Sequence, residues 1–248
     1  MKILETVFKG YWQFGFKTRL YDGLCPHAYH QSLQAAAGKV EAVNGTRMLD
    51  LGCGSGLLVR YLDEALDRGL RYVGTDRLPS GLVQLKQKAA LLSPQTHTHA
   101  LLSDMLETWP LKPETFDYVV AHFSVYTLNR AEDRRRVYEC IARVLKPGGC
   151  AVLSNPSDTY NAQQIIKSSV RSQKGELSLC EQRVRRYLLY PMTLLLGLRH
   201  IQQQLENGVW HAYSREAFCE EVESAGLNVE QVESVYAGSG YLLVARKS

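Results

Sequence analysis

Short apolar runs alternate with longer amphipathic runs between residues 46 and 155. Apolar runs of four to eight residues are typical of buried β-strands, and apolar positions three and four apart are typical of α-helices. This alternation predicts a parallel sheet built from βαβ units. Strands are expected at 47–51, 71–76, 98–104, 116–123 and 149–155, with helices between them at 56–69, 80–92 and 131–146.

The pattern changes after residue 155 and then returns. Polar and basic stretches with helical spacing predict a helical insertion over 156–210. From Ser214, an N-cap serine and an apolar face predict a helix, and strands are expected at 228–237 and 240–247. The link between these two strands is too short for a crossover helix, so we expect an antiparallel pair.

The predicted fold class is therefore α/β. We expect a Rossmann-like, mostly parallel seven-stranded sheet with an antiparallel last strand and helices on both faces. The regions are a helical N-terminal lid segment, a ligand-binding α/β core, a helical insertion that caps the substrate, and a C-terminal helix with the strand pair that completes the core. Their boundaries are 1–45, 46–155, 156–210 and 211–248.

Composition narrows the function classes. The 248 residues are 45% hydrophobic and 22% charged, and the net charge of +4 is too small and too scattered to indicate a nucleic-acid partner. Six scattered cysteines without a C-x-x-C pair suggest neither a disulfide framework nor a zinc site. No signal peptide is indicated, so we expect a cytoplasmic chain, and the oligomeric state is left open.

A glycine-rich turn follows the first predicted strand. Its glycines, Gly52, Gly54 and Gly56, remove the β-carbons that would keep a ligand away from the backbone, and the following helix is expected to present free N–H groups. The spacing G-x-G-x-G differs from the G-x-G-x-x-G of a dinucleotide site. Asp50 in front of the turn would repel a pyrophosphate and suits an ammonium group instead.

Five segments in this order resemble class I S-adenosylmethionine-dependent methyltransferases, in particular those that methylate small molecules. They are "LDLGCGSG", "VGTD", "LLSDM", "FDYVVAHFSVYTL" and "VLKPGGCAVLSN". The resemblance implies S-adenosylmethionine as cofactor, S-adenosylhomocysteine as product and no metal.

The resemblance also implies roles for individual residues. The turn from Gly52 through Cys53 and Gly54 to Gly56 would lie beneath the methionine part, with Asp50 near its ammonium. Asp76 would bind the ribose hydroxyls, and Arg77 and Leu78 would flank the adenine. Asp104 would accept a hydrogen bond from the adenine amino group, and Met105 would donate its backbone N–H to the ring.

Catalytic residues are harder to identify, because the sulfonium already activates the methyl group. His122, just past the fourth strand, is the candidate general base, and it is equally suited to packing against the cofactor. Substrate contacts are assigned to Tyr21, His30, Tyr126 and His211, each of which a core or surface position would also explain.

The regions outside the core, 1–45 and 156–210, are expected to cover the cleft and to choose the substrate. Their rings and apolar residues favour a hydrophobic or aromatic small molecule, methylated on O, N or C in secondary or cofactor metabolism. In "RVRRYLLYPMTLLLGLRH", a lid helix buried against the domain is favoured over a helix on a membrane surface. The alternatives are an RNA methyltransferase and a non-catalytic cofactor-binding protein.

Overall fold

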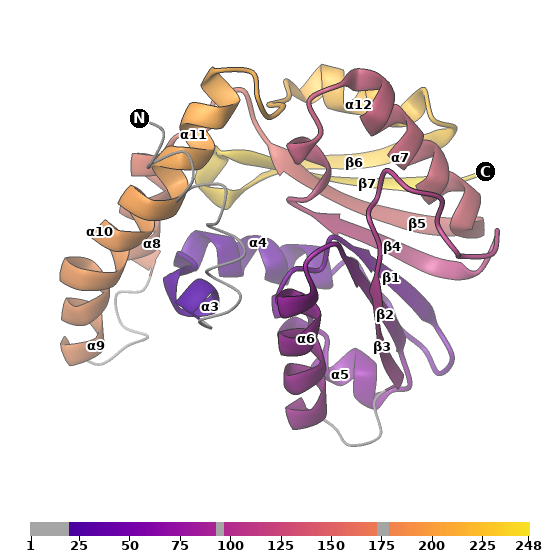
Figure 1. Cartoon of the computed structure of the whole chain (residues 1–248), viewed down its shortest axis with the longest axis horizontal. Helices are drawn as coiled ribbons and strands as arrows, with labels where there is room; N and C mark the ends of the chain where they lie inside the picture. Colours follow the sequence, from indigo (N-terminus) through magenta and orange to yellow (C-terminus); the bar gives the residue numbers. More distant parts are fainter. Residues whose placement is uncertain (1–19, 93–96, 173–178) are drawn as a thin grey trace.

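A seven-stranded sheet forms the centre of the computed structural model, which describes residues 20–92, 97–172 and 179–248 (Figure 1). The strand order is β3-β2-β1-β4-β5-β7-β6. Six strands run parallel and β7 runs antiparallel between β5 and β6, as the sequence predicts. The strands are β1 Arg47–Leu51, β2 Arg71–Asp76, β3 His97–Leu102, β4 Phe116–His122, β5 Leu145–Pro156, β6 Leu227–Val235 and β7 Gly240–Lys247.

The sheet is buried on both faces. Because successive strand residues point to opposite sides, neighbouring residues pack into different hydrophobic clusters. Met48 packs into one cluster while its neighbour Leu49 packs into the other, and Val120 and Val119 divide in the same way. The first cluster includes residues of α4 (His27–Ala37), α6 (Pro79–Leu92) and α8 (Ala162–Ser172), and the second includes residues of α7 (Ala131–Val144) and α12 (Arg215–Glu223).

Two helix boundaries are determined by local residues. Ser214 accepts a hydrogen bond from the backbone N–H of Ala217 at 3.1 Å, which confirms the predicted N-cap of α12. Helix α7 ends at Val144, and the chain is already extended at Leu145, where β5 begins. The predicted helix stop at Pro147 therefore comes earlier, because the residues before a proline avoid the helical region.

The helix predicted for 56–69 is wrong as a single element. The chain forms a 3-10 turn, η1 (Leu57–Tyr61), and then a short helix, α5 (Asp63–Asp67), with non-helical backbone at Leu62. Leu57, Leu58 and Val59 are all buried, so this turn is enclosed on more than one side and lacks the single apolar face of a surface helix.

A long helix crosses one end of the molecule. We call residues 179–206 the helical arm; it runs without a break through α9 (Leu179–Val184), η3 (Arg185–Leu189), α10 (Tyr190–Thr193), η4 (Leu194–Leu198) and α11 (Arg199–Glu206) (Figure 1). The segments η3 and η4 are π-helical turns. Pro191 cannot donate to the carbonyl four residues earlier, so the turn before it widens. None of the described helices is both long and apolar enough to span a bilayer.

Three short elements complete the described chain. They are α3 (Leu20–Leu24), η2 (Val125–Thr127) and η5 (Tyr236–Gly238). Each of these elements contributes at least one residue to the cavity described next.

Candidate functional site

A cavity of about 310 Å³ lies at the carboxyl ends of β1, β2, β3 and β4. The strand order reverses between β1 and β4, and open α/β sheets bind ligands at such a point. The glycine turn lies along one side of this cavity, where Gly52 and Gly54 adopt φ of +74° and +53°. A Cβ on Gly52 would lie 2.5 Å from the Cβ of Ser124, so this turn requires glycine.

The N–H groups of the turn itself form hydrogen bonds within the protein. Gly52 and Cys53 both donate to the carbonyl oxygen of Thr75, at 2.8 and 2.9 Å, and Gly54 donates to Asp76 Oδ2 at 2.8 Å. Gly56 turns inward, where a Cβ would lie 2.5 Å from Leu85, and it does not line the cavity. The glycines therefore serve close approach and packing, while side-chain carboxylates offer the acceptors.

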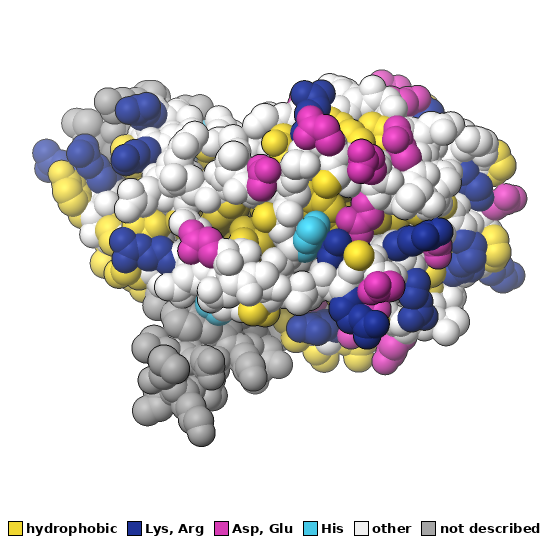
Figure 2. All heavy atoms as spheres, turned by 90° about the horizontal axis from the view of Figure 1, so that it is seen from above, with side chains coloured by type: hydrophobic (Ala, Val, Ile, Leu, Met, Phe, Trp, Pro, Cys, Tyr) yellow, Lys and Arg dark blue, Asp and Glu magenta, His cyan; other side chains and the backbone are white. Residues whose placement is uncertain are grey.

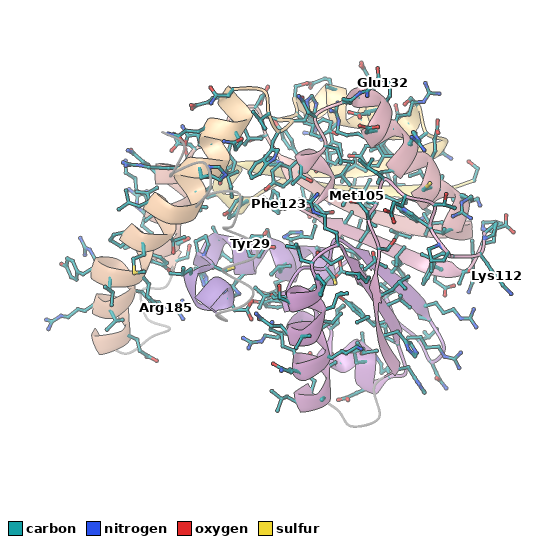
Figure 3. The ribbon with its side chains drawn as sticks, in the orientation of Figure 1. Tyr29, Met105, Lys112, Phe123, Glu132 and Arg185 are labelled. Carbon is teal, nitrogen blue, oxygen red and sulfur yellow. The ribbon has the colours of Figure 1, made fainter. Side chains whose placement is uncertain are left out.

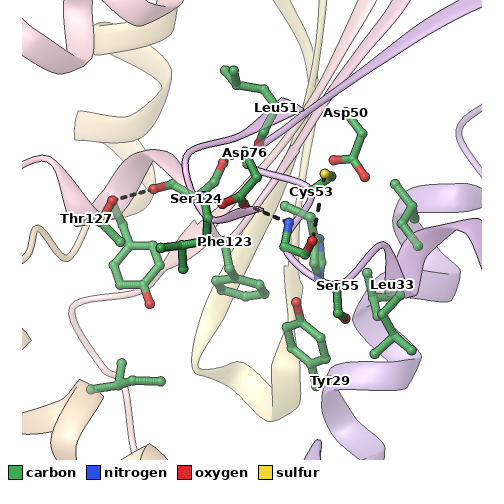
Figure 4. Close-up of a pocket in the computed structure, with 18 of the residues that line it drawn as sticks. Tyr29, Leu33, Asp50, Leu51, Cys53, Ser55, Asp76, Phe123, Ser124 and Thr127 are labelled. Atoms are coloured by element: carbon green, nitrogen blue, oxygen red, sulfur yellow. Dashed lines mark hydrogen bonds between the residues drawn. The ribbon is translucent and has the colours of Figure 1, made fainter. Parts of the chain in front are cut away.

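Asp76 lies at the end of β2 and lines the cavity. Its Oδ2 accepts from Gly54 and its Oδ1 accepts from the backbone N–H of Leu78 at 2.8 Å (Figure 4). Each carboxylate oxygen keeps a second acceptor position, which is what two vicinal ribose hydroxyls need. Burial raises the pKa of Asp76, and its backbone hydrogen bonds oppose that shift.

Asp50 is buried behind the turn and is paired with Tyr72, whose hydroxyl donates to Asp50 Oδ2. Burial, with a smaller contribution from the nearby Asp76, raises the pKa of Asp50 to about 7. A cationic group entering the cavity would favour the ionised form. An ammonium group that binds beside Asp50 would therefore favour loss of its proton and then contact an ionised carboxylate.

The third carboxylate follows β3. Asp104 accepts the backbone N–H of Leu106 at 3.0 Å through Oδ1, and its side chain lines the cavity. Met105 and the exposed Arg77 also line it, as does Cys53, whose thiol has its pKa raised well above the ordinary value by burial. We call Asp50, Asp76 and Asp104 the carboxylate wall.

Six aromatic side chains from other elements also line the cavity. We call this set the ring wall; it consists of Tyr29, Phe123, Tyr126, Tyr160, Trp210 and Tyr236. The ring centroids of Phe123 and Tyr236 lie 5.1 Å apart, and Tyr29 lies 6.1 and 5.8 Å from them. Figure 3 labels Tyr29 and Phe123, which come from separate elements.

Two of these rings belong to residues with a strained backbone. Phe123 and Tyr236 both have positive φ, +48° and +55°, which is rare for large side chains. Gly240 leaves room for the Phe123 ring, since a Cβ there would lie 2.8 Å from its Cζ. Strain of this kind persists where surrounding packing over-determines it, and it clusters at ligand sites.

His122 lines the cavity with both ring nitrogens engaged. Ser32 donates its hydroxyl to the carbonyl oxygen of Tyr29, so it accepts from Nε2 of His122 at 3.1 Å. Nδ1 then accepts from the hydroxyl of Ser154 at 2.9 Å. Burial lowers the pKa of His122 to about 3. These contacts give His122 a packing role rather than that of a general base.

The predicted substrate residues are distributed unevenly. Tyr126 lines the cavity, with its ring 5.5 Å from that of Trp210. His30 lies outside it, with Nδ1 2.6 Å from the hydroxyl of Tyr61, and His211 packs on the Tyr213 ring at 4.3 Å. Burial lowers the pKa of both histidines to about 4. The side chain of Tyr21 lies outside the described residues, as does the remainder of the ring-rich segment before it.

A buried ion pair ties α3 to the glycine turn. Lys88 Nζ lies 2.7 Å from Asp22 Oδ2 and donates to the carbonyl oxygen of Ser55 at 2.6 Å. The hydroxyl of Ser55 donates to Asp22 Oδ1 at 2.7 Å. The N-terminal helix α3 is therefore fixed directly against the turn that borders the cavity.

Sequence reasoning missed most of the ring wall. Phe123, Tyr160, Trp210 and Tyr236 come from four segments that only the fold brings together. Two signals were present, since Phe123 directly follows the fourth strand and Tyr236 precedes the glycine pair that links the last two strands. Their positive φ values have no signature in the sequence.

Within residues 20–92, 97–172 and 179–248, the structure holds no group of three or more His, Cys, Asp or Glu side chains suited to a metal ion.

Comparison with known proteins agrees with the cofactor signals: residues 48–149 match a family model described as a methyltransferase domain. This confirms the resemblance to class I S-adenosylmethionine-dependent methyltransferases.

Two relatives differ in their substrates. The 18S rRNA (guanine-N(7))-methyltransferase bud23 of Schizosaccharomyces pombe is 31% identical over 140 residues, 53% of this chain and 49% of the relative. The cypemycin N-terminal methyltransferase of a Streptomyces species is 27% identical over 244 residues, 92% of this chain and 95% of the relative. The chain thus spans about half the length of the first relative.

Solved structures confirm the predicted fold. A putative methyltransferase in complex with the Trm112 methyltransferase activator of Haloferax volcanii is similar with a TM-score of 0.63 and 18% identity, over 96% of both chains. The N-methyltransferase NodS of Bradyrhizobium japonicum, in complex with S-adenosylhomocysteine, is similar with a TM-score of 0.56 and 14% identity, over 94% of this chain and 98% of that one.

Proposed function

Because residues 48–149 form a methyltransferase domain of the class I, S-adenosylmethionine-dependent type, we propose that the chain methylates a small hydrophobic or aromatic molecule. One observation carries this proposal: the cavity has carboxylates along one side and aromatic rings along the other. Among the described residues that line it, the charged side chains are Asp50, Asp76, Arg77 and Asp104, all at the ends of β1, β2 and β3.

The carboxylate wall fits the cofactor. Asp76 has one open acceptor position on each oxygen for the ribose, and Asp50 is a buried carboxyl that an ammonium group would ionise. Gly52 and Gly54 leave the cofactor room against the backbone. When bound, S-adenosylmethionine supplies a methyl group made electrophilic by the positive charge on its sulfur.

The ring wall orients the molecule that accepts the methyl group, and it excludes water. Flat or aliphatic groups pack against Tyr29, Phe123 and Tyr236, and rings also stabilise positive charge that faces them. Alignment of an acceptor atom with the methyl group is the larger part of what such a site contributes to the rate.

Proton removal is not assigned to His122. Its ring is neutral, and both nitrogens are hydrogen-bonded to serines. We therefore expect an acceptor whose nucleophile needs no protein base at the reacting atom: a neutral amine, a carbon nucleophile or an oxygen that is already ionised. Any proton that the acceptor releases passes to water.

Methyl transfer into a fractionated cell extract tests the proposal. The purified protein would be incubated with methyl-labelled cofactor, and label would be counted in the small-molecule, lipid, RNA and protein pools, with Asp76→Asn as the control with weakened cofactor binding. We expect label in the small-molecule or lipid pool. Label confined to RNA would favour the alternative that the bud23 relative suggests, and no label with intact cofactor binding would favour a non-catalytic binding protein.

A further inference from the structure

The helical arm presents an apolar face to solvent. We call this face the outer stripe; it consists of Val184, Tyr187, Leu188, Met192 and Leu195, all of them exposed. Tyr187 is 70% exposed and Leu188 is 57% exposed, which is unusual for large apolar residues at successive helical positions. The sequence favoured a lid helix buried against the domain; one face of the arm is buried in this way, and the outer stripe is the face that stays exposed.

The arm cannot turn this face inward, because its opposite face is already packed. Tyr190, Thr193 and Leu198 are buried, and the hydroxyl of Thr193 donates to the carbonyl oxygen of Leu24 at 2.7 Å. Thr193, Leu198 and Ile201 also line the cavity. One helix therefore faces the proposed acceptor site on one side and solvent on the other.

Positive charge accompanies the outer stripe. Arg183 and Arg186 are exposed and Arg185 is half-buried, against the single exposed acid Glu181 in these described turns. The guanidinium of Arg186 lies 5.5 Å from the centre of the Tyr187 ring. Figure 2 shows blue basic side chains beside yellow hydrophobic ones at the left end of the molecule, where the arm lies.

Helix α8 extends the same charge. It packs beside η4 and carries the exposed side chains of Lys167 and Arg171. A second copy of the chain docking through the stripe would bring these like charges together, which disfavours self-association. An anionic surface has no such penalty.

We propose that the outer stripe docks on the surface of an anionic phospholipid bilayer. Apolar residues with an aromatic ring enter the headgroup boundary, and flanking arginines contact lipid phosphates, as in helices that lie in a membrane interface. On the basis of the proposed function, this docking brings the cavity beside the bilayer, so that an apolar acceptor enters along the inner face of the arm.

Vesicle flotation tests the proposal with the full chain. Phosphatidylcholine vesicles would be compared with vesicles that also contain phosphatidylglycerol. We expect at least tenfold stronger binding to the anionic vesicles, and at least a tenfold loss for Tyr187→Ser with Leu188→Ser and for Arg183→Glu with Arg186→Glu. The matched control is Leu91→Ser on α6, where an 86% exposed leucine lies outside the stripe, and we expect less than a twofold change.

Each other outcome overturns the proposal. Absent or equal binding to both vesicle types excludes an anionic lipid surface, and an equal loss in Leu91→Ser excludes the stripe as its site. Concentration-dependent dimerisation that the serine variants abolish would assign the stripe to a second copy. Affinity for S-adenosylhomocysteine, measured on every variant, separates this result from the proposed function: its absence in the wild type would refute cofactor use and leave the vesicle result standing.

Discussion

The carboxylate wall and the ring wall meet in one cavity but are built differently. Asp50 and Asp76 lie in neighbouring parallel strands, and backbone or tyrosine donors fix them locally. Tyr29, Phe123 and Tyr236 come from a helix, a strand end and a short turn that are far apart in sequence. The comparison teaches that the regular sheet itself brings the carboxylates together, whereas the rings meet only through the folding of distant segments. Under the proposed function, the first half binds the cofactor and the second half chooses the methyl acceptor.

Of the substitutions considered, Asp76→Asn should weaken cofactor binding most. We expect about a 100-fold weaker affinity for S-adenosylhomocysteine, because two hydrogen bonds to a charged acceptor are lost or weakened. Titration calorimetry measures it, and Asp63→Asn, a change at the start of α5 away from the cavity, serves as control. Equal affinities of Asp76→Asn and wild type would contradict the assigned role.

The raised pKa of Asp50 predicts that the affinity for the cofactor depends on pH. Below pH 7 the carboxyl is protonated and neutral, so the dissociation constant of the cofactor should rise about tenfold for each pH unit between 7 and 5.5. Asp50→Asn should bind weakly and without this slope. A slope that persists in the variant would assign the titration to another group.

The same shift has a consequence for stability without ligand. The folded carboxyl of Asp50 holds its proton up to about pH 7, whereas the unfolded one loses it near pH 4. The folded state therefore binds more protons in this window, and the free energy of unfolding should fall as the pH rises from about 4 to about 7. Denaturant unfolding should show a weaker decline in Asp50→Asn, and an equal decline would contradict the assignment.

Gly240→Ala should disturb the ring wall alone. A Cβ at this position would lie 2.8 Å from the Phe123 ring, so the ring must move out of its place beside Tyr236. We expect about a tenfold loss of methyl transfer into the acceptor pool at saturating cofactor, since misalignment lowers the rate steeply. Affinity for S-adenosylhomocysteine should change less than twofold, and an equal loss in both would show that the two walls are not separable.

His122→Gln should have the smallest effect on the rate. A general base contributes about 10²- to 10⁴-fold, whereas a packing role predicts a loss below about tenfold with an unchanged pH profile between 6 and 9. Transfer rates over this pH range measure it, and thermal unfolding of the same variant reports the lost serine contacts. A 100-fold loss of rate with unchanged folding would restore His122 as the base.

The strands and the carboxylates could be predicted because their signals are local. Val137, Ile141 and Val144 keep helical spacing, and all three are buried in α7 as expected. Asp76 follows an apolar run and lies at a strand end, where the sheet itself brings it to the ligand edge.

The remainder depends on packing that no short pattern carries. Leu57 to Val59 have an apolar pattern that fits a helix, yet the chain forms a 3-10 turn there with all three side chains buried. The hydrogen bonds of Gly52, Cys53 and Gly54 to Thr75 and Asp76 join the turn to the second strand, and no pattern in the sequence predicts them. The exposure of the outer stripe likewise depends on which face of the arm the domain covers.

A structure of the protein with S-adenosylhomocysteine bound tests the central claim most directly. The account predicts ribose oxygens about 3 Å from the Asp76 carboxylate, the amino group toward Asp50, and the sulfur facing the rings of Phe123 and Tyr236. An adenosine group stacked on the ring wall, with Asp76 free of contact, would contradict it.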